Sequence, residues 1–285
     1  MLSLGVVAAI ITLIVWSVSL TMERKIVRLS GNLRGSLLII ASGVLPMLLF
    51  YAISPFELNL YAIILAVASG IFLALGYILY YKALETEQIS NTSGTGLAQP
   101  AILIIFGVLA LSEAINAVQA LAGLLIFVGV IFIITNNKLK FNRKLIPALL
   151  ANVSWAAYWI FASYAILSLN QLASTLLVAR LIALLIVVAI FRFAFKPGLG
   201  GRISSKVFSY LMAISVIAGV LDGFGNVTFG IAVSSNLISL AGIFTAAAPL
   251  IVTGLSYVVY KERLTKLQGF GMGLAVIGAL VLTIF

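Results

Sequence analysis

Long apolar stretches fill most of the chain, and short polar segments separate them. An α-helix rises 1.5 Å per residue, so a stretch of about 20 residues crosses a hydrocarbon layer about 30 Å thick. The stretches lack the strict alternation of apolar and polar residues that a membrane β-barrel requires. The sequence therefore predicts an all-α polytopic membrane protein with ten transmembrane helices. The expected spans are approximately 3–22, 34–54, 58–83, 89–111, 114–135, 145–167, 171–194, 206–232, 235–260 and 264–285.

The second half of the chain repeats the first at a distance of 149 residues. The matches include rare residue types together with glycines, which a shared apolar content alone would seldom produce. A duplicated apolar chain is typical of membrane transporters. We expect a first repeat over residues 1–137 and a second over 138–285, which together form one integrated transport domain. The matched positions are Gly70 with Gly219, Gly76 with Gly225, Ala83 with Ala232, Ile89-Ser90 with Ile238-Ser239, Pro100 with Pro249, Glu113 with Glu262, Gln119 with Gln268, and Gly129 with Gly278.

Each repeat has five expected spans, and an odd number of crossings makes the second copy enter the membrane from the opposite side. The halves are then inverted repeats, related by a pseudo-two-fold axis in the membrane plane. The first helix matches at a different distance, 139 residues, which aligns Trp16 with Trp155; a Gly-rich loop over 196–202 absorbs the difference. Inverted repeats place a shared site near the middle of the membrane, and rocking exposes that site to each side in turn.

Composition and charge agree with a membrane protein and set an orientation. Hydrophobic residues make up 63% of the chain and charged residues 8%, against roughly a quarter charged in a soluble domain. Apart from Arg180, every Lys and Arg flanks an odd-numbered loop. Because positive residues are retained in the cytoplasm, we expect both termini outside it. The net charge of +10 is interpreted as topology and contact with the lipid bilayer of the cell membrane, and not as nucleic-acid binding.

The chain contains no Cys and no His, so neither a zinc site nor a serine-protease triad can be assembled. A P-loop motif is also absent from the sequence. These absences argue against an enzyme, and neither a metal site nor a cofactor is expected. The first apolar stretch lacks a basic leading segment and runs for about 20 residues, so we expect a helix there and not a signal peptide.

Two charged residues fall inside expected spans, where a charge costs about 2.5–3.5 kcal/mol and usually pairs or faces a wet cavity. Asp222 is a candidate proton or cation acceptor, because the other six acidic residues lie near span ends. If it couples protons, Asp222→Asn should abolish pH-driven flux. The alternative is a structural ion pair with Arg180, which is itself a candidate for contact with an anionic group of a solute. These alternatives stay open at the level of sequence.

Helical spacing places aromatic and polar side chains on common faces. Asn152, Trp155 and Trp159 stand at i, i+3 and i+7 in the sixth expected span. The eighth and third spans show a comparable spacing. Such faces indicate a cavity for an aromatic or amphipathic solute, and the alternative is an interfacial aromatic belt or ordinary packing. The candidate residues of this cavity are Trp16, Tyr77, Tyr80, Asn91, Asn152, Trp155, Trp159 and Asn226.

Proline and small residues mark expected breaks in the helices. Pro100 and Pro249 each remove a backbone hydrogen bond, so we expect a hinge or kink at each. The polar segment 90–96 precedes Pro100; it is predicted either to unwind in part and bind solute through its backbone, or to pack closely through its small residues. In the last expected span, Gly269, Gly271 and Gly273 include a GxxxG spacing, which is interpreted as packing on neighbouring helices.

The region around Pro249 carries a family resemblance. It continues with Lys261-Glu262-Arg263-Leu264, then Gln268 and a Gly-rich last helix. This pattern is similar to the EamA-type ten-helix members of the drug/metabolite transporter superfamily, which end each five-helix half with a Pro-containing helix, a short Glu-Arg loop and a final apolar helix. Trp16 and the run Tyr80-Tyr81-Lys82-Ala83-Leu84 also resemble that family. The first half departs from the pattern, because Ser112-Glu113-Ala114 lacks the Arg. In many relatives both termini lie inside, opposite to the charge bias here.

Taken together, these features predict a secondary active transporter that exports or exchanges small metabolites by alternating access. The expected solutes are amino-acid-like, aromatic or amphipathic, and a proton or a counter-substrate is the expected coupling partner. A solute channel and a non-transporting membrane protein are the alternatives. The sequence leaves open whether the protein is a monomer or a homodimer.

Overall fold

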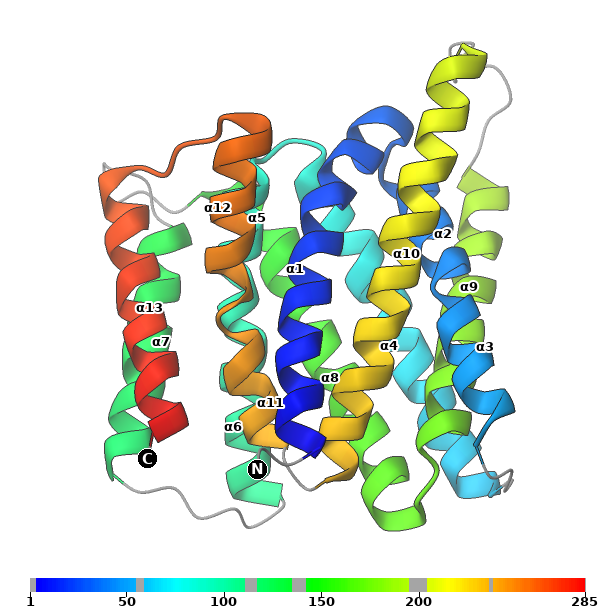
Figure 1. Ribbon diagram of the computed structural model, residues 1–285, viewed down its shortest axis with the longest axis horizontal. Helices are drawn as coiled ribbons and strands as arrows, with labels where there is room; N and C mark the ends of the chain where they lie inside the picture. Colours follow the sequence, from blue (N-terminus) through cyan, green and yellow to red (C-terminus); the bar gives the residue numbers. More distant parts are fainter. Residues whose placement is uncertain are drawn as a thin grey trace.

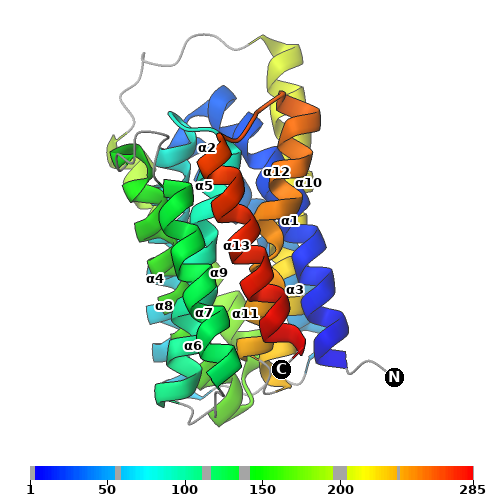
Figure 2. The ribbon, with the colours of Figure 1, turned by 90° about the vertical axis from the view of Figure 1, so that its left-hand side faces the viewer.

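The computed structural model describes residues 4–54, 59–110, 117–134, 142–194, 204–235 and 238–284. Within these ranges the regular secondary structure is helical, and the helices form one elongated bundle (Figures 1 and 2). The helices are α1 (Leu4–Ser30), α2 (Asn32–Ser42), α3 (Val44–Ala52), α4 (Leu60–Leu84), α5 (Ile89–Gly94), η1 (Thr95–Leu97), α6 (Ala98–Ala110), α7 (Ala117–Ile134), η2 (Arg143–Leu145), α8 (Ile146–Leu169), α9 (Leu172–Ala194), α10 (Ser205–Ser234), α11 (Ile238–Thr245), α12 (Ala248–Tyr260) and α13 (Lys266–Ile284).

The all-α class is confirmed for the described part of the chain, and these helices occupy the positions of the expected spans. Six helical stretches within it are long and apolar enough to cross a membrane. Two of the other expected spans are divided into shorter helices, α5–η1–α6 and α11–α12. The count of ten crossings therefore stays a prediction. The six stretches are Leu4–Ser30, Asn32–Ala52, Leu60–Leu84, Arg143–Leu169, Leu172–Phe193 and Ser205–Ser234.

The polar residues between apolar stretches begin and end the helices. The Asn59 side chain accepts hydrogen bonds from the backbone N–H groups of Tyr61 and Ala62, and it thereby satisfies two free donors at the start of α4. Asn170 adopts a left-handed conformation (φ 53°) that ends α8, and α9 starts two residues later. Short connections of this kind hold successive helices antiparallel.

Both predicted proline breaks coincide with interruptions of the helix. Segment 90–96 does not unwind, because it stays helical through α5 and tightens into the 3₁₀ turn η1 just before Pro100. In the second half, α11 ends at Thr245, and Pro249 stands in the first turn of α12. N–H groups of a first turn make no hydrogen bond within the helix, so the missing N–H of proline costs nothing there. Of the two alternatives for residues 90–96, the structure contradicts partial unwinding, and both interruptions of the helix are present.

The two halves of the chain interlock by exchanging helix contacts. Helix α1 packs along α10, and α4 packs along α8, so the first helix of each half lies against the third helix of the other. Helices α7 and α13, the last of each half, pack against each other. Helix α2 also packs on α10, and α9 packs on α4, so the second helix of each half contacts the third helix of the other. This reciprocal pattern is what a pseudo-two-fold relation between the halves produces.

Two glycines make the exchanged contacts possible. The Trp16 indole of α1 occupies the space that a side chain at Gly225 of α10 would need, and the Trp155 indole of α8 occupies the corresponding space at Gly76 of α4. The four residues are the two pairs that the sequence repeat aligns. A larger side chain at either glycine would displace a tryptophan, so the helices approach closely only because these positions lack a Cβ.

The GxxxG spacing in α13 does not have the expected packing role. Gly269 and Gly273 face open space, with nothing within 4 Å of a side chain built there. Packing instead uses the opposite face of the helix, where the Gly271 carbonyl meets Gly129 of α7. Successive odd positions on a helix point in different directions, so only one of the three glycines lies in the interface.

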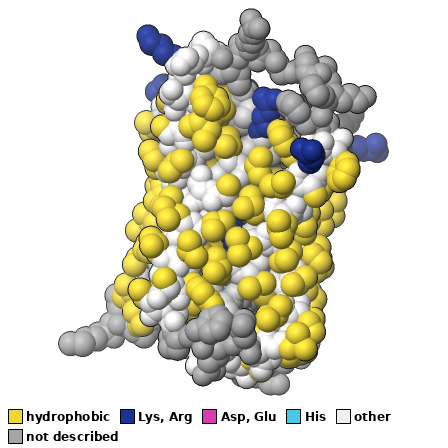
Figure 3. Space-filling view, turned by 90° about the vertical axis from the view of Figure 1, so that its right-hand side faces the viewer, with side chains coloured by type: hydrophobic (Ala, Val, Ile, Leu, Met, Phe, Trp, Pro, Cys, Tyr) yellow, Lys and Arg dark blue, Asp and Glu magenta, His cyan; other side chains and the backbone are white. Residues whose placement is uncertain are grey.

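The outer surface shows one apolar band and one basic end. Hydrophobic side chains cover the long side of the molecule in Figure 3, and the visible Lys and Arg side chains gather at one end. Both chain termini lie at the opposite end in Figure 1. On this face the basic side chains thus lie at the end away from the termini, in agreement with the loop assignment from sequence.

Candidate functional site

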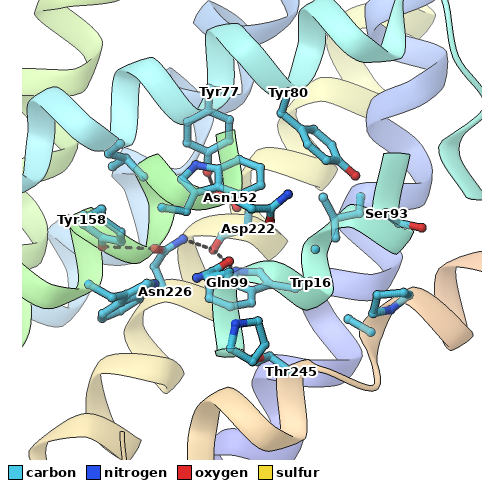
Figure 4. Close-up of a pocket in the computed structure, with 18 of the residues that line it drawn as sticks. Trp16, Tyr77, Tyr80, Ser93, Gln99, Asn152, Tyr158, Asp222, Asn226 and Thr245 are labelled. Atoms are coloured by element: carbon cyan, nitrogen blue, oxygen red, sulfur yellow. Dashed lines mark hydrogen bonds between the residues drawn. The ribbon is translucent and has the colours of Figure 1, made fainter. Parts of the chain in front are cut away.

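A cavity lined by helices of both halves lies inside the bundle (Figure 4). Its lining comes from α1, α4, α5–η1–α6, α8, α10 and α11–α12. The cavity volume of about 90 Å³ is several times the roughly 10–15 Å³ that a single water needs, so an organic solute can occupy it. Among the sequence-predicted residues, those that line it are Trp16, Tyr77, Tyr80, Pro100, Asn152, Trp155, Trp159, Asp222, Asn226 and Pro249.

Aromatic rings form much of the wall. The chain has three tryptophans, and all of them line the cavity. Trp155 packs on Tyr80 with 5.0 Å between ring centroids, and Trp159 packs on Phe229 at 4.2 Å. These rings support one another and leave apolar faces toward the cavity, which suits an aromatic or amphipathic solute.

Asp222 and Arg180 form a buried ion pair. The Arg180 Nη2 atom lies 2.8 Å from Asp222 Oδ2, and the Tyr77 hydroxyl donates a hydrogen bond to the same carboxylate oxygen. Arg180 also donates through Nη1 to the Tyr77 oxygen at 2.8 Å. The carboxylate therefore has a cation and a hydroxyl at bonding distance, and both of its partners are themselves buried.

A helix break supplies the remaining partners of Arg180. Helix α2 ends before Gly43, whose N–H donates to the Ile39 carbonyl, and the last carbonyl groups of a helix have accepting capacity left for other donors. The Ile39 and Ile40 carbonyls accept hydrogen bonds from Arg180 Nη2 and Nε at 2.8 and 3.0 Å. All three guanidinium nitrogens are thus engaged, and Arg180 is fully buried and does not line the cavity. This arrangement corresponds to the structural ion pair, one of the two alternatives that the sequence left open.

The two asparagines are tied into the wall by their amide groups. Asn226 donates to the Asp222 backbone carbonyl at 2.9 Å and accepts from the Tyr158 hydroxyl at 3.1 Å (Figure 4). Asn152 donates to Thr95 Oγ1 at 3.1 Å and so connects α8 to the 3₁₀ turn η1. These bonds fix polar atoms at defined positions in an otherwise apolar cavity.

Asn91 is the one predicted cavity residue that does not line the cavity. It lies on α5, and its Oδ1 is buried without a hydrogen-bond partner. Helix α5 turns Ser93 toward the cavity, and η1 turns Gly96 the same way. Positions two apart on a helix point about 200° apart, so the face with Ser93 excludes Asn91.

Glu23 lines the cavity and was missed by the sequence analysis. The first span was expected to end at residue 22, which placed Glu23 at an interface, but α1 continues to Ser30 and carries Glu23 into the bundle. The side chain is 1% exposed. The spacing of Trp16, Leu20 and Glu23 at i, i+4 and i+7 is the signal that would have found it, because it places all three on one face of α1. The other lining residues that the sequence did not single out as candidates include Leu20, Ser93, Gln99, Tyr158 and Thr245.

A second polar cluster ties helix ends together at the basic end of the molecule. Glu262, just after α12, pairs with Arg24 of α1. Glu262 also accepts from the backbone N–H and the hydroxyl of Ser90, at 3.1 and 2.9 Å, which satisfies donors at the start of α5. The Tyr260 hydroxyl donates to the Thr21 carbonyl at 2.7 Å. This cluster, Arg24 with Glu262, Ser90, Tyr260 and Thr21, joins α1, α5 and α12 beyond one end of the cavity. Glu113, the repeat partner of Glu262, lies outside the described residues.

Comparison with known proteins assigns the family. The family model of the EamA-like transporter family matches residues 3–135 and 143–284. No curated protein matches the chain. Solved structures do, and one titled "Crystal structure of protein" is 16% identical, with a TM-score of 0.66, over 98% of this chain and 96% of that one. At that identity the likeness shows a shared fold. The chain belongs to the EamA-like transporter family, and it is a multi-pass membrane transporter of the drug/metabolite type.

Proposed function

We propose that this protein is a secondary carrier that exports or exchanges small amphipathic or aromatic metabolites by alternating access. The observation that carries the proposal is the position of the cavity, which is lined by helices of both repeats and lies between them. Rocking one repeat against the other changes the packing around such a site, and this exposes it first to one side of the membrane and then to the other.

The end cluster around Glu262 supports a gate at the basic end. Its bonds join α1, α5 and α12, which all contribute lining residues. A gate needs contacts that hold in one state and release in the other. An ion pair between helix ends meets that need, because breaking it exposes charges to water and not to lipid. Opening at this end therefore requires the Arg24–Glu262 pair to separate.

The orientation is proposed from charge. The basic end faces the cytoplasm under the positive-inside rule, and both termini face away from it. A reporter fused after Phe285 checks this orientation, and a cytoplasmic signal contradicts it.

A counterflow assay tests the carrier proposal. A thermal-shift screen of the purified protein against a metabolite library first identifies a ligand. Proteoliposomes are then loaded with unlabelled ligand, and uptake of the labelled compound is measured. A carrier gives uptake that saturates and that rises with internal ligand, because the loaded cavity returns faster than the empty one. Uptake that is linear in concentration and indifferent to internal ligand would indicate a channel and contradict the proposal.

A further inference from the structure

The charge balance of the cavity distinguishes between solutes. Among the described residues, the lining holds two carboxyl groups, Glu23 and Asp222, and neither Lys nor Arg. Asp222 is compensated by Arg180 at 2.8 Å. Glu23 has no such partner: it forms no ion pair in the described structure, and the next residue, Arg24, is paired with Glu262.

The immediate surroundings of Glu23 are neutral or already engaged. Its Oε1 accepts one hydrogen bond, from Ser19 at 3.1 Å. Its Oε2 is buried and has no hydrogen bond of good geometry, and the same holds for the neighbouring Tyr81 hydroxyl. The other titratable groups that act on it are Tyr77 and Tyr80 of α4, Asp222 of α10 and Arg180 of α9, whose three nitrogens are all used. Glu23 is thus the acidic group of the cavity that lacks a counter-charge.

A buried carboxylate without a counter-charge is unfavourable, and a cationic ligand relieves it. The aromatic wall adds to this preference, because ring faces attract an ammonium group. Tyr80 lines the same cavity, and its hydroxyl is also buried without a partner; it points to the Ser93 side of the cavity (Figure 4). An ammonium group has three donors, so it can bond the carboxylate and a hydroxyl oxygen together.

A zwitterionic amino acid fits less well. Its carboxylate needs a cation or several free donors, and Arg180 is unavailable because it lies behind the wall with every nitrogen engaged. Asn152 donates both of its amide N–H groups to the protein, and Asn226 donates one of its two. A solute carboxylate would therefore enter beside Glu23 and Asp222 without an opposite charge to compensate it.

We infer that the cavity binds an amphipathic primary amine, with its ammonium group on Glu23 and its apolar part against the tryptophans, in preference to the matching amino acid. This inference rests on the proposed transport function and specifies its solute. The positive charge of the solute replaces the missing counter-charge of Glu23. Asp222, already paired, holds the wall in place and takes no part in recognising that charge.

The test compares three probes that share one ring. Purified protein is titrated with 2-phenylethylamine, phenylalanine and 2-phenylethanol, and the fluorescence of its tryptophans is followed. Because all three tryptophans line the cavity, the signal reports on this site. We expect the amine to bind at least about tenfold tighter than the other two, the difference that one charge-assisted hydrogen bond supplies.

Two variants locate the preference. Glu23→Gln should weaken amine binding at least about tenfold and leave 2-phenylethanol unchanged, because only the charge is lost. The control is Glu85→Gln, the same chemical change at an exposed residue that accepts from the Asn32 N–H, and it should bind as the wild type does. If Glu23→Gln does not fold, Glu23→Asp keeps the charge and should keep the preference for amine over amino acid.

Three results would overturn the inference. Unchanged amine binding in folded Glu23→Gln would mean that Glu23 holds only a proton or a structural bond. Phenylalanine binding as tightly as the amine would mean that the cavity accepts a carboxylate. The protein could also bind and exchange other compounds from the screen but not the amine. That result would contradict the inference about the amine and would leave the carrier proposal intact.

Discussion

Asp222 and Glu23 are two buried carboxyl groups in one cavity, and their surroundings differ in kind. Asp222 has a guanidinium and a tyrosine hydroxyl at bonding distance. Glu23 accepts from one serine hydroxyl and lies beside the Tyr81 hydroxyl, and no opposite charge stands at bonding distance in the described structure. Desolvation disfavours both charges, but only Asp222 is repaid by an opposite charge inside the protein. Asp222 is thus a structural part of the wall, and Glu23 is the carboxyl group that we infer to meet a solute.

The largest effect is expected when the compensation of Asp222 is removed. Arg180→Met should lower the free energy of unfolding by about 3–5 kcal/mol, since it leaves a buried carboxylate without its counter-charge and removes the guanidinium donor to the Ile40 carbonyl. Thermal unfolding in detergent measures it. Arg180→Met combined with Asp222→Asn should cost less than Arg180→Met alone, because no buried charge remains. In the same assay Glu23→Gln should be as stable as the wild type. Equal destabilisation by Arg180→Met and Glu23→Gln would contradict the distinction between a structural Asp222 and a Glu23 that has no structural role.

A smaller effect is expected at Glu262, a third carboxyl, which is compensated at the end of the molecule. Glu262→Gln keeps the size of the side chain but removes the charge that pairs with Arg24 and accepts from Ser90. We expect a loss of about 1.5–3 kcal/mol in the same unfolding assay, the range for hydrogen bonds to charged groups. Glu85→Gln, outside this cluster, should change stability by less than about 0.5 kcal/mol. Equal stability of Glu262→Gln and Glu85→Gln would show that the cluster around Glu262 does not stabilise the helix ends.

The helices could be predicted from sequence because hydropathy in a membrane protein reports directly on the backbone. The repeat aligned Gly76 with Gly225, and the structure shows that each receives the tryptophan of the other half, a contact that the alignment did not predict. Hydropathy does not predict the end of a helix that continues beyond its apolar stretch. Helix α1 continues to Ser30, so a boundary drawn at residue 22 removed Glu23 from consideration.

Other parts of the site could not be predicted because they depend on rotation and on distant partners. Whether Asn91 or Ser93 faces the cavity is decided by the rotation of α5, which composition does not report. Whether Asp222 is free or paired depends on where Arg180 lies. Arg180 is oriented by the Ile39 and Ile40 carbonyl groups at the α2–α3 break, which are 141 and 140 residues away from it in sequence. Gly269 and Gly273 show the same limit, since their spacing is right for packing but they face open space.

The most direct test of the central claim, a cavity between the repeats that opens to each side in turn, uses the absence of cysteine from the chain. Ser93→Cys places one thiol in the cavity lining, and Ser163→Cys places one in α8 outside that lining as a control. Reaction with a membrane-impermeant thiol reagent is measured in intact cells and in inverted vesicles. We expect that Ser93→Cys reacts from both sides, that bound ligand slows the reaction, and that Ser163→Cys stays unreactive. Reaction of Ser93→Cys from one side only, or from neither, would contradict it.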